Sequence, residues 1–89
     1  MYRLEVSPSV NRDLAKLRSR IREDDFGRLR TAIGGLAEDP RLPGVRKLVG
    51  AERAYRIRVG NYRVVYEIYD DNNLVLILQV ARRNESTYR

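Results

Sequence analysis

The stretch AYRIRVGNYRVVYEI, residues 54–68, decides the fold because it predicts two β-strands joined by a tight turn. Apolar and polar residues alternate along it with the period of two that is typical of a strand. Gly60-Asn61 fits a type II′ turn, which takes glycine in its first position. With that turn, Arg58 lies directly opposite Arg63, and like charges in this arrangement destabilise a sheet. The hairpin therefore contains an unfavourable charge pair that needs an explanation.

The same alternation sorts the hairpin into an apolar face and an arginine-bearing face. The apolar face, which we expect to pack under helices, comprises Tyr55, Ile57, Val59, Tyr62, Val64, Tyr66 and Ile68. The other face carries Arg56, Arg58 and Arg63 together with Val65 and Glu67. An ordinary solvated face, with Glu67 paired to one arginine, is the alternative. Three converging guanidinium groups favour an anion site, and phosphate suits it because it accepts several charge-assisted hydrogen bonds.

Outward from the hairpin, the remaining elements follow from periodicity and capping signals. We expect a strand over residues 2–6, a helix from Ser7-Pro8 onward, a second helix over 23–37, a Pro- and Gly-containing connection over 41–52, and strands over 54–59, 62–69 and 74–81. The last strand is apolar on both faces, which predicts a central position. The order β-α-α-β-β-β predicts an α+β fold in which a helical hairpin packs on one face of a mostly antiparallel four-stranded sheet.

Composition limits the chemistry that the chain can perform. The 89 residues are enough for one domain, residues 1–89, and they include no cysteine and no histidine. This excludes thiolate and imidazole chemistry, and we expect no metal and no cofactor. No apolar run approaches the length of a membrane span, so we expect a soluble, cytoplasmic protein with no membrane association.

Charge favours an anionic partner. The formal net charge is +6, and sixteen of the eighteen basic residues are arginine. Arginine suits phosphate and carboxylate recognition, although codon usage in a GC-rich genome would produce the same bias. A second basic pair, Arg82-Arg83, ends the last strand, where pairing with the 62–69 strand would bring it close to Arg63. Simple parity puts Arg82 on the arginine-bearing face. If the anionic partner is RNA, Arg82 and Lys47 are predicted as additional contacts to it.

The hairpin motif YRIRVGNYRVVYEI, followed by VLILQVARRNESTY, resembles the RelE/ParE superfamily of bacterial and archaeal type II toxins. The order and spacing of YRLEVSPSV, LAEDPRL and RKLVG agree with that resemblance along essentially the whole chain. The resemblance implies the β-α-α-β-β-β fold and an acidic cognate antitoxin that forms an oligomeric complex with the toxin. In RelE-like members it implies cleavage of mRNA in the ribosomal A site by attack of a 2′-OH, which inhibits translation.

The resemblance also implies which residues act on the RNA. The catalytic set falls on Arg56, Arg58, Arg63, Arg83 and Tyr88. Arg63 and Arg83 would stabilise the phosphoryl charge, and Tyr88 would stack on or orient the substrate. Arg56 and Arg58 stand where the best-known member has lysines, which favours an electrostatic role over proton abstraction because arginine has a pKa above about 12.

Two other functions remain open from the sequence. The ParE branch shares the fold and inhibits DNA gyrase by protein–protein binding without this catalytic set. A binding module without toxicity, held in a complex with its antitoxin, is the third possibility. Retention of the arginines and the tyrosine together favours the mRNA endoribonuclease.

Overall fold

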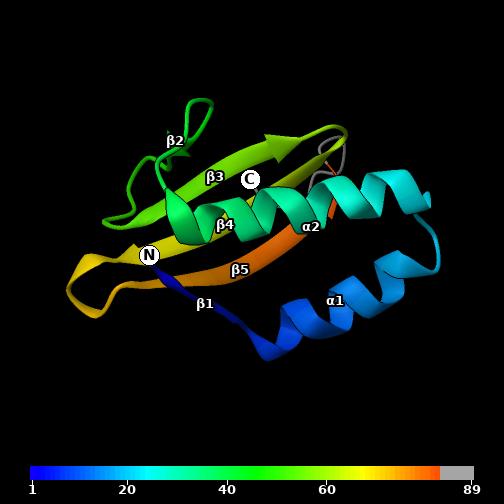
Figure 1. Cartoon of the computed structure of the whole chain (residues 1–89), viewed down its shortest axis with the longest axis horizontal. Coiled ribbons are helices and arrows are strands. Elements are labelled where there is room, and N and C mark those ends of the chain that lie inside the picture. The colour runs from blue at the N-terminus through cyan, green and yellow to red at the C-terminus, as the bar shows by residue number, and fades with distance from the viewer. Residues whose placement is uncertain (83–89) are drawn as a thin grey trace.

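The computed structural model describes residues 1–82 and forms a five-stranded mixed sheet with two helices on one of its faces. The strands are β1 (Arg3–Val6), β2 (Arg46–Lys47), β3 (Ala54–Val59), β4 (Tyr62–Tyr69) and β5 (Leu74–Arg82), and the helices are α1 (Pro8–Arg18) and α2 (Glu23–Glu38). Figure 1 shows both helices on the same side of the sheet, with α2 in front of the strands and α1 beside β5. This confirms the predicted α+β class and the helical hairpin.

The sheet has the order β1-β5-β4-β3-β2. β5 is therefore a central strand, as its apolar sequence predicts. β1 pairs with β5 in parallel and the other three pairings are antiparallel. A short 3₁₀ helix, Asp70–Asn72, and Asn73 with φ 49° connect β4 to β5.

The predicted number of strands was wrong, because the sheet has five strands rather than four. The additional strand is β2, which lies in the stretch predicted as an irregular connection and pairs with β3 at the edge of the sheet. Two residues are too few to show an alternating pattern, so the strand exists only through its tertiary pairing.

The start of α1 follows the capping signals in the sequence. Ser7 is the N-cap, its Oγ accepts a hydrogen bond from the Val10 amide at 3.4 Å, and Pro8 takes the first helical position. Glu23, Asp24 and Asp25 occupy the first turn of α2, where the helix dipole favours negative charge. α1 begins where the sequence predicts, and α2 ends one residue beyond the predicted range of 23–37.

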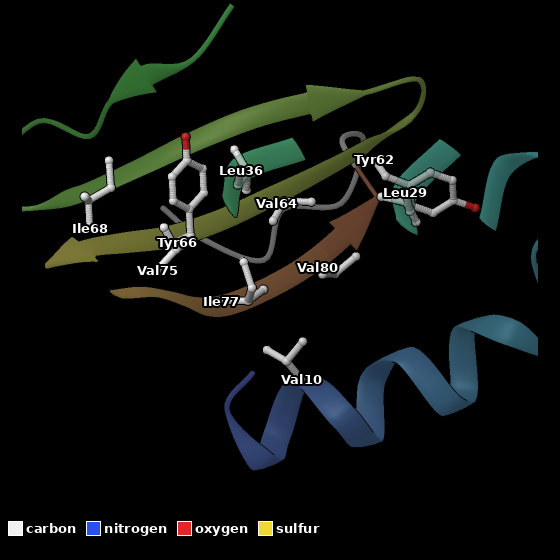
Figure 2. Close-up of a cluster of buried hydrophobic side chains, with 10 residues drawn as sticks. All are labelled: Val10, Leu29, Leu36, Tyr62, Val64, Tyr66, Ile68, Val75, Ile77 and Val80. Carbon is white, nitrogen blue, oxygen red and sulfur yellow. The ribbon is translucent and has the colours of Figure 1, made fainter. Parts of the chain in front are cut away.

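The hydrophobic core lies between the helices and the apolar face of the hairpin. Figure 2 shows its buried side chains, which are Val10, Leu29, Leu36, Tyr62, Val64, Tyr66, Ile68, Val75, Ile77 and Val80. Tyr62, Val64, Tyr66 and Ile68 alternate along β4, which confirms the predicted core face of that strand. Within residues 1–82, no helix lies on the opposite face of the sheet, which carries Arg56, Arg58 and Arg63.

Candidate nucleic-acid interface

The hairpin register brings arginines face to face. Arg58 pairs with Arg63 and Val59 pairs with Tyr62 across the β3–β4 ladder, which confirms the predicted register. Gly60 at the turn has φ 58°, and Asn61 is not among the residues with positive φ, as a type II′ turn requires. A one-residue slip would turn Tyr62 and Val64 out of the core, so core packing fixes the opposed arginines in place.

A fourth arginine joins this face from the sheet edge. Arg46 of β2 lies directly opposite Arg56 of β3, and paired residues project to the same side of a sheet. We call Arg46, Arg56, Arg58 and Arg63 the arginine face. Sequence reasoning missed Arg46 because β2 has no recognisable alternation. The only signal was a basic dipeptide, Arg46-Lys47, shortly before the hairpin.

The four members of the arginine face differ in exposure. Arg46 and Arg58 are exposed, and Arg56 is half-buried. Arg63 is 5% exposed, and its Nε and Nη2 atoms are inaccessible to solvent. The sequence predicted the face on which Arg63 lies but not its burial. Arg63 is the least exposed to water of the four guanidinium groups.

The predicted position of Arg82 was wrong, because a β-bulge reverses the parity of β5. Tyr66 pairs with Ile77 and Val65 pairs with Gln79, so Leu78 is an additional residue in the strand. Beyond the bulge, Val80 points into the core and Arg82 pairs with Tyr62. Arg82 is therefore exposed on the helix side of the sheet, and Ala81 takes the place opposite Arg63.

Of the remaining predicted site residues, the structure describes only Lys47, which is not on the arginine face. Lys47 is exposed and pairs with Tyr55, which puts it on the helix side of the sheet edge. Arg83 and Tyr88 lie outside the described residues. The structure thus brings Arg56, Arg58 and Arg63 together as predicted, and adds Arg46.

A model of the ParE toxin of the type II toxin–antitoxin system parDE matches residues 4–87. The chain belongs to the ParE toxin family. This confirms the resemblance to the RelE/ParE superfamily and makes the chain a toxin of the type II toxin–antitoxin kind.

Individual relatives of this ParE-family toxin carry the RelE name. The mRNA interferase toxin RelE of Escherichia coli is 29% identical over 87 residues, which are 96% of this chain and 86% of that protein. The crystal structure of isolated E. coli RelE superposes with a TM-score of 0.79 at 22% identity, covering 98% of this chain and 89% of that one. The archaeal RelE–RelB complex from Pyrococcus horikoshii has a TM-score of 0.76 at 25% identity, with coverages of 96% and 98%.

A second polar cluster in the ParE-family toxin lies at the other end of β4. Asp70 accepts two hydrogen bonds from the Arg41 guanidinium, at 3.1 and 2.9 Å, and one from the Tyr2 hydroxyl at 2.6 Å. These hydrogen bonds lower the pKa of Asp70 to about 2, with the Arg41 bonds as the larger cause. The same contact with Asp70 raises the pKa of Tyr2. This cluster ties the chain start and the segment after α2 to the β4–β5 turn.

Aromatic contacts extend this second cluster into the core. The Arg41 guanidinium lies 5.5 Å from the ring centre of Tyr55, which stacks on Tyr66 with ring centres 6.1 Å apart. The Tyr66 hydroxyl donates a hydrogen bond of 2.6 Å to the Pro40 carbonyl. Burial is the main cause that raises the pKa of Tyr66. Asp70, Arg41, Tyr2 and the Tyr66 hydroxyl all have partners within the toxin, so the cluster stabilises the fold.

The four arginines of the arginine face can bind and stabilise anionic charge, but none of them is an ordinary proton acceptor. The sequence has no histidine, and a guanidinium remains protonated at any physiological pH. Within residues 1–82, no three His, Cys, Asp or Glu side chains come together in a way that could hold a metal ion. No helix of that part of the chain is long and apolar enough to cross a membrane.

Proposed function

We propose that this toxin is an endoribonuclease that cleaves mRNA in the ribosomal A site. The observation that carries the proposal is the pair Arg58 and Arg63, held opposite each other on the face of the sheet that neither α1 nor α2 covers. Like charges placed this way cost the fold free energy, and an anion bound between them would offset that cost. The name of the E. coli relative, an mRNA interferase toxin, supports mRNA as the source of that anion.

The reaction is a transesterification within the RNA. The 2′-hydroxyl loses its proton, and its oxygen attacks the adjacent phosphorus and forms a cyclic phosphate, while the bond from phosphorus to the 5′-oxygen breaks and that oxygen gains a proton. Negative charge accumulates on the phosphoryl oxygens in the transition state. Preorganised cations aimed at those oxygens lower the barrier, and removal of one such donor costs about 100- to 1000-fold in rate.

Roles follow from charge and burial. Arg63, which is 5% exposed, is proposed to stabilise the charge on the phosphoryl oxygens, and Arg83 is proposed to act with it. Arg56 and Arg58 hold the phosphate and the 2′-OH in line for attack. Tyr88 is proposed to stack on a base of the substrate.

Proton transfer is the weak step of this arrangement. None of these arginines is a good general base at neutral pH, so the protein alone is expected to cleave slowly. Positioning of the mRNA by the ribosome would compensate, which is why the proposal includes ribosome dependence. Such a reaction takes place in the cytoplasm.

The proposed partner is an acidic antitoxin. The toxin carries a net charge of +6, and β1 and β2 are the edge strands of its sheet. An acidic, partly disordered chain can neutralise this charge and cover a strand edge. Solved RelE–RelB complexes from P. horikoshii and E. coli support this kind of partner.

Inhibition of DNA gyrase by protein–protein binding is the second candidate function. It is favoured by one observation, the match of residues 4–87 to the ParE toxin family. It does not account for the opposed arginines, since a protein–protein inhibitor gains nothing from a phosphate site. The two candidates affect different processes and can be separated directly.

The test compares translation and DNA supercoiling with the same purified toxin. The nuclease proposal expects cuts in ribosome-bound mRNA and unchanged supercoiling by gyrase. Arg63→Ala and Arg83→Ala are each expected to abolish the cuts. Intact mRNA together with inhibited supercoiling would establish the second candidate and refute the first.

A further inference from the structure

A groove lies between α1 and the second half of β5, on the helix side of the sheet. β1 pairs with β5 only as far as Ile77, so from Leu78 to Arg82 the outer edge of β5 faces α1 instead of a strand. The groove has a volume of about 380 Å³. That volume lies within the range of about 300–1000 Å³ found for ligand sites.

Three cations and one carboxylate line this groove. Lys16 and Arg20 come from α1 and the turn after it, Arg82 comes from the end of β5, and Asp13 is the carboxylate. Within residues 1–82, none of these four side chains forms an ion pair or a hydrogen bond. A cationic groove whose charges remain unpaired, even with Asp13 nearby, suits an anionic ligand.

The groove also contains an aromatic residue. Tyr62 lines it and is 8% exposed. In Figure 2 the hydroxyl of Tyr62 points away from the other core side chains. A phenol hydroxyl can donate a hydrogen bond to a phosphate oxygen. Tyr62 therefore adds a neutral donor to the three cations.

The groove and the arginine face lie on the two sides of the same end of the sheet. Tyr62 and Arg63 are neighbours in β4 and point to opposite faces, and their β5 partners are Arg82 and Ala81. The bulge at Leu78 is what turns Arg82 to the groove side. A chain that passes around this end of the sheet can contact both surfaces.

We propose that the α1–β5 groove binds the phosphate backbone of the RNA strand beside the cleaved bond, with Lys16, Arg20 and Arg82 as its phosphate contacts. The proposal rests on the proposed function, because it extends the path of the same substrate. An RNA strand fits better than an acidic peptide because the groove adjoins the face where the scissile phosphate is proposed to bind. Phosphates at regular spacing can engage both surfaces at once.

The test is binding of a short single-stranded RNA with 2′-O-methyl riboses, which cannot be cleaved, at increasing salt concentration. The variant Lys16→Ala/Arg20→Ala removes two exposed groove cations. The control Arg12→Ala/Arg28→Ala removes two exposed cations that do not line the groove. The slope of log K against log salt is negative, and each lost phosphate contact reduces its magnitude by about 0.7 for a single strand. The groove variant is therefore expected to lose about 1.4 from its slope, and the control close to none.

Each other outcome overturns the proposal. Equal losses of slope in the two variants would mean that only net charge matters. If the wild type does not bind RNA even at low salt, RNA is not the ligand of the groove. Binding of a polyglutamate peptide that depends on Lys16 and Arg20, with RNA binding unaffected, would assign the groove to an acidic protein partner. Cleavage of ribosome-bound mRNA is measured in parallel. Absence of cleavage refutes the proposed function, while the slope comparison still decides whether RNA binds in the groove.

Discussion

Charged side chains are arranged in opposite ways at the two ends of β4. Near its start, Arg63 lies opposite Arg58, and on the next strand pair Arg56 lies opposite Arg46. Asp70 comes seven residues later, about 23 Å along the chain at about 3.3 Å per residue, and it accepts hydrogen bonds from Arg41 and Tyr2. The Asp70 end of β4, which we call the paired end, joins opposite charges, whereas the arginine face places like charges opposite one another across the strands.

This contrast separates stability from function. At the Asp70 end, each contact lowers the free energy of the folded state, and no ligand is needed to explain it. At the arginine face, the fold tolerates a repulsion that a single substitution would relieve. Local rules are broken mainly at functional sites, so the opposed arginines indicate the site and the paired cluster does not.

The largest expected effect concerns the buried arginine. Arg63→Met keeps the length of the side chain and removes its charge, and we expect mRNA cleavage on programmed ribosomes to fall at least about 100-fold. Arg41→Met makes the same change at the other end of β4 and should leave the cleavage rate of the folded protein unchanged. Equal rates for the Arg63 variant and the wild type would contradict the role of Arg63.

The next effect concerns stability at the paired end. Tyr66→Phe removes the hydroxyl that bonds to the Pro40 carbonyl in a buried setting, which should cost about 1 kcal/mol. Thermal unfolding followed by circular dichroism should show Tm lower by about 4–8 °C. Tyr69→Phe, which removes a half-exposed bond to Glu67, should lower Tm less. An equal loss in both variants would show that burial is not the cause.

Low pH should remove the stability that ionised Asp70 contributes at the paired end. The pKa of Asp70 is about 2 in the folded protein against an ordinary value of 3.8, so its contribution is present above pH 3.8 and is lost as pH falls toward 2. Urea midpoints measured between about pH 5 and pH 2 should fall less steeply for Asp70→Asn than for the wild type. Parallel pH profiles for the two proteins would contradict this linkage.

The smallest expected effect has the opposite sign. Arg58→Gln relieves the repulsion with Arg63 and should stabilise the fold by about 0.2–0.5 kcal/mol, which raises Tm by about 1–3 °C. Arg12→Gln, an exposed change on α1, should leave Tm unchanged. A lower Tm for Arg58→Gln would mean that Arg58 supports the fold, and the contrast between the two ends would fail.

The sequence predicted what local rules determine. The hairpin register followed from Gly60-Asn61 and period-two alternation, and the start of α1 followed from Ser7-Pro8. Three arginines of the arginine face could therefore be assigned to one side of the sheet before the structure was known.

What the sequence could not predict depends on contacts between distant segments. Arg46 reaches the arginine face only because β2 pairs with β3, and two residues carry no periodic signal. Arg82 changes sides because of one additional residue at Leu78, which no turn or glycine signal marks. The burial of Arg63 also requires the assembled fold.

The most direct test of the central claim is primer extension on mRNA after induction of the toxin in growing cells. Three proteins are compared: the wild type, Arg58→Ala, and Arg41→Ala as the matched loss of one arginine at the paired end. The account predicts cuts within translated codons for the wild type and Arg41→Ala, and a loss of cuts for Arg58→Ala at equal protein level. Cuts that persist in Arg58→Ala, or that disappear equally in both variants, would contradict it.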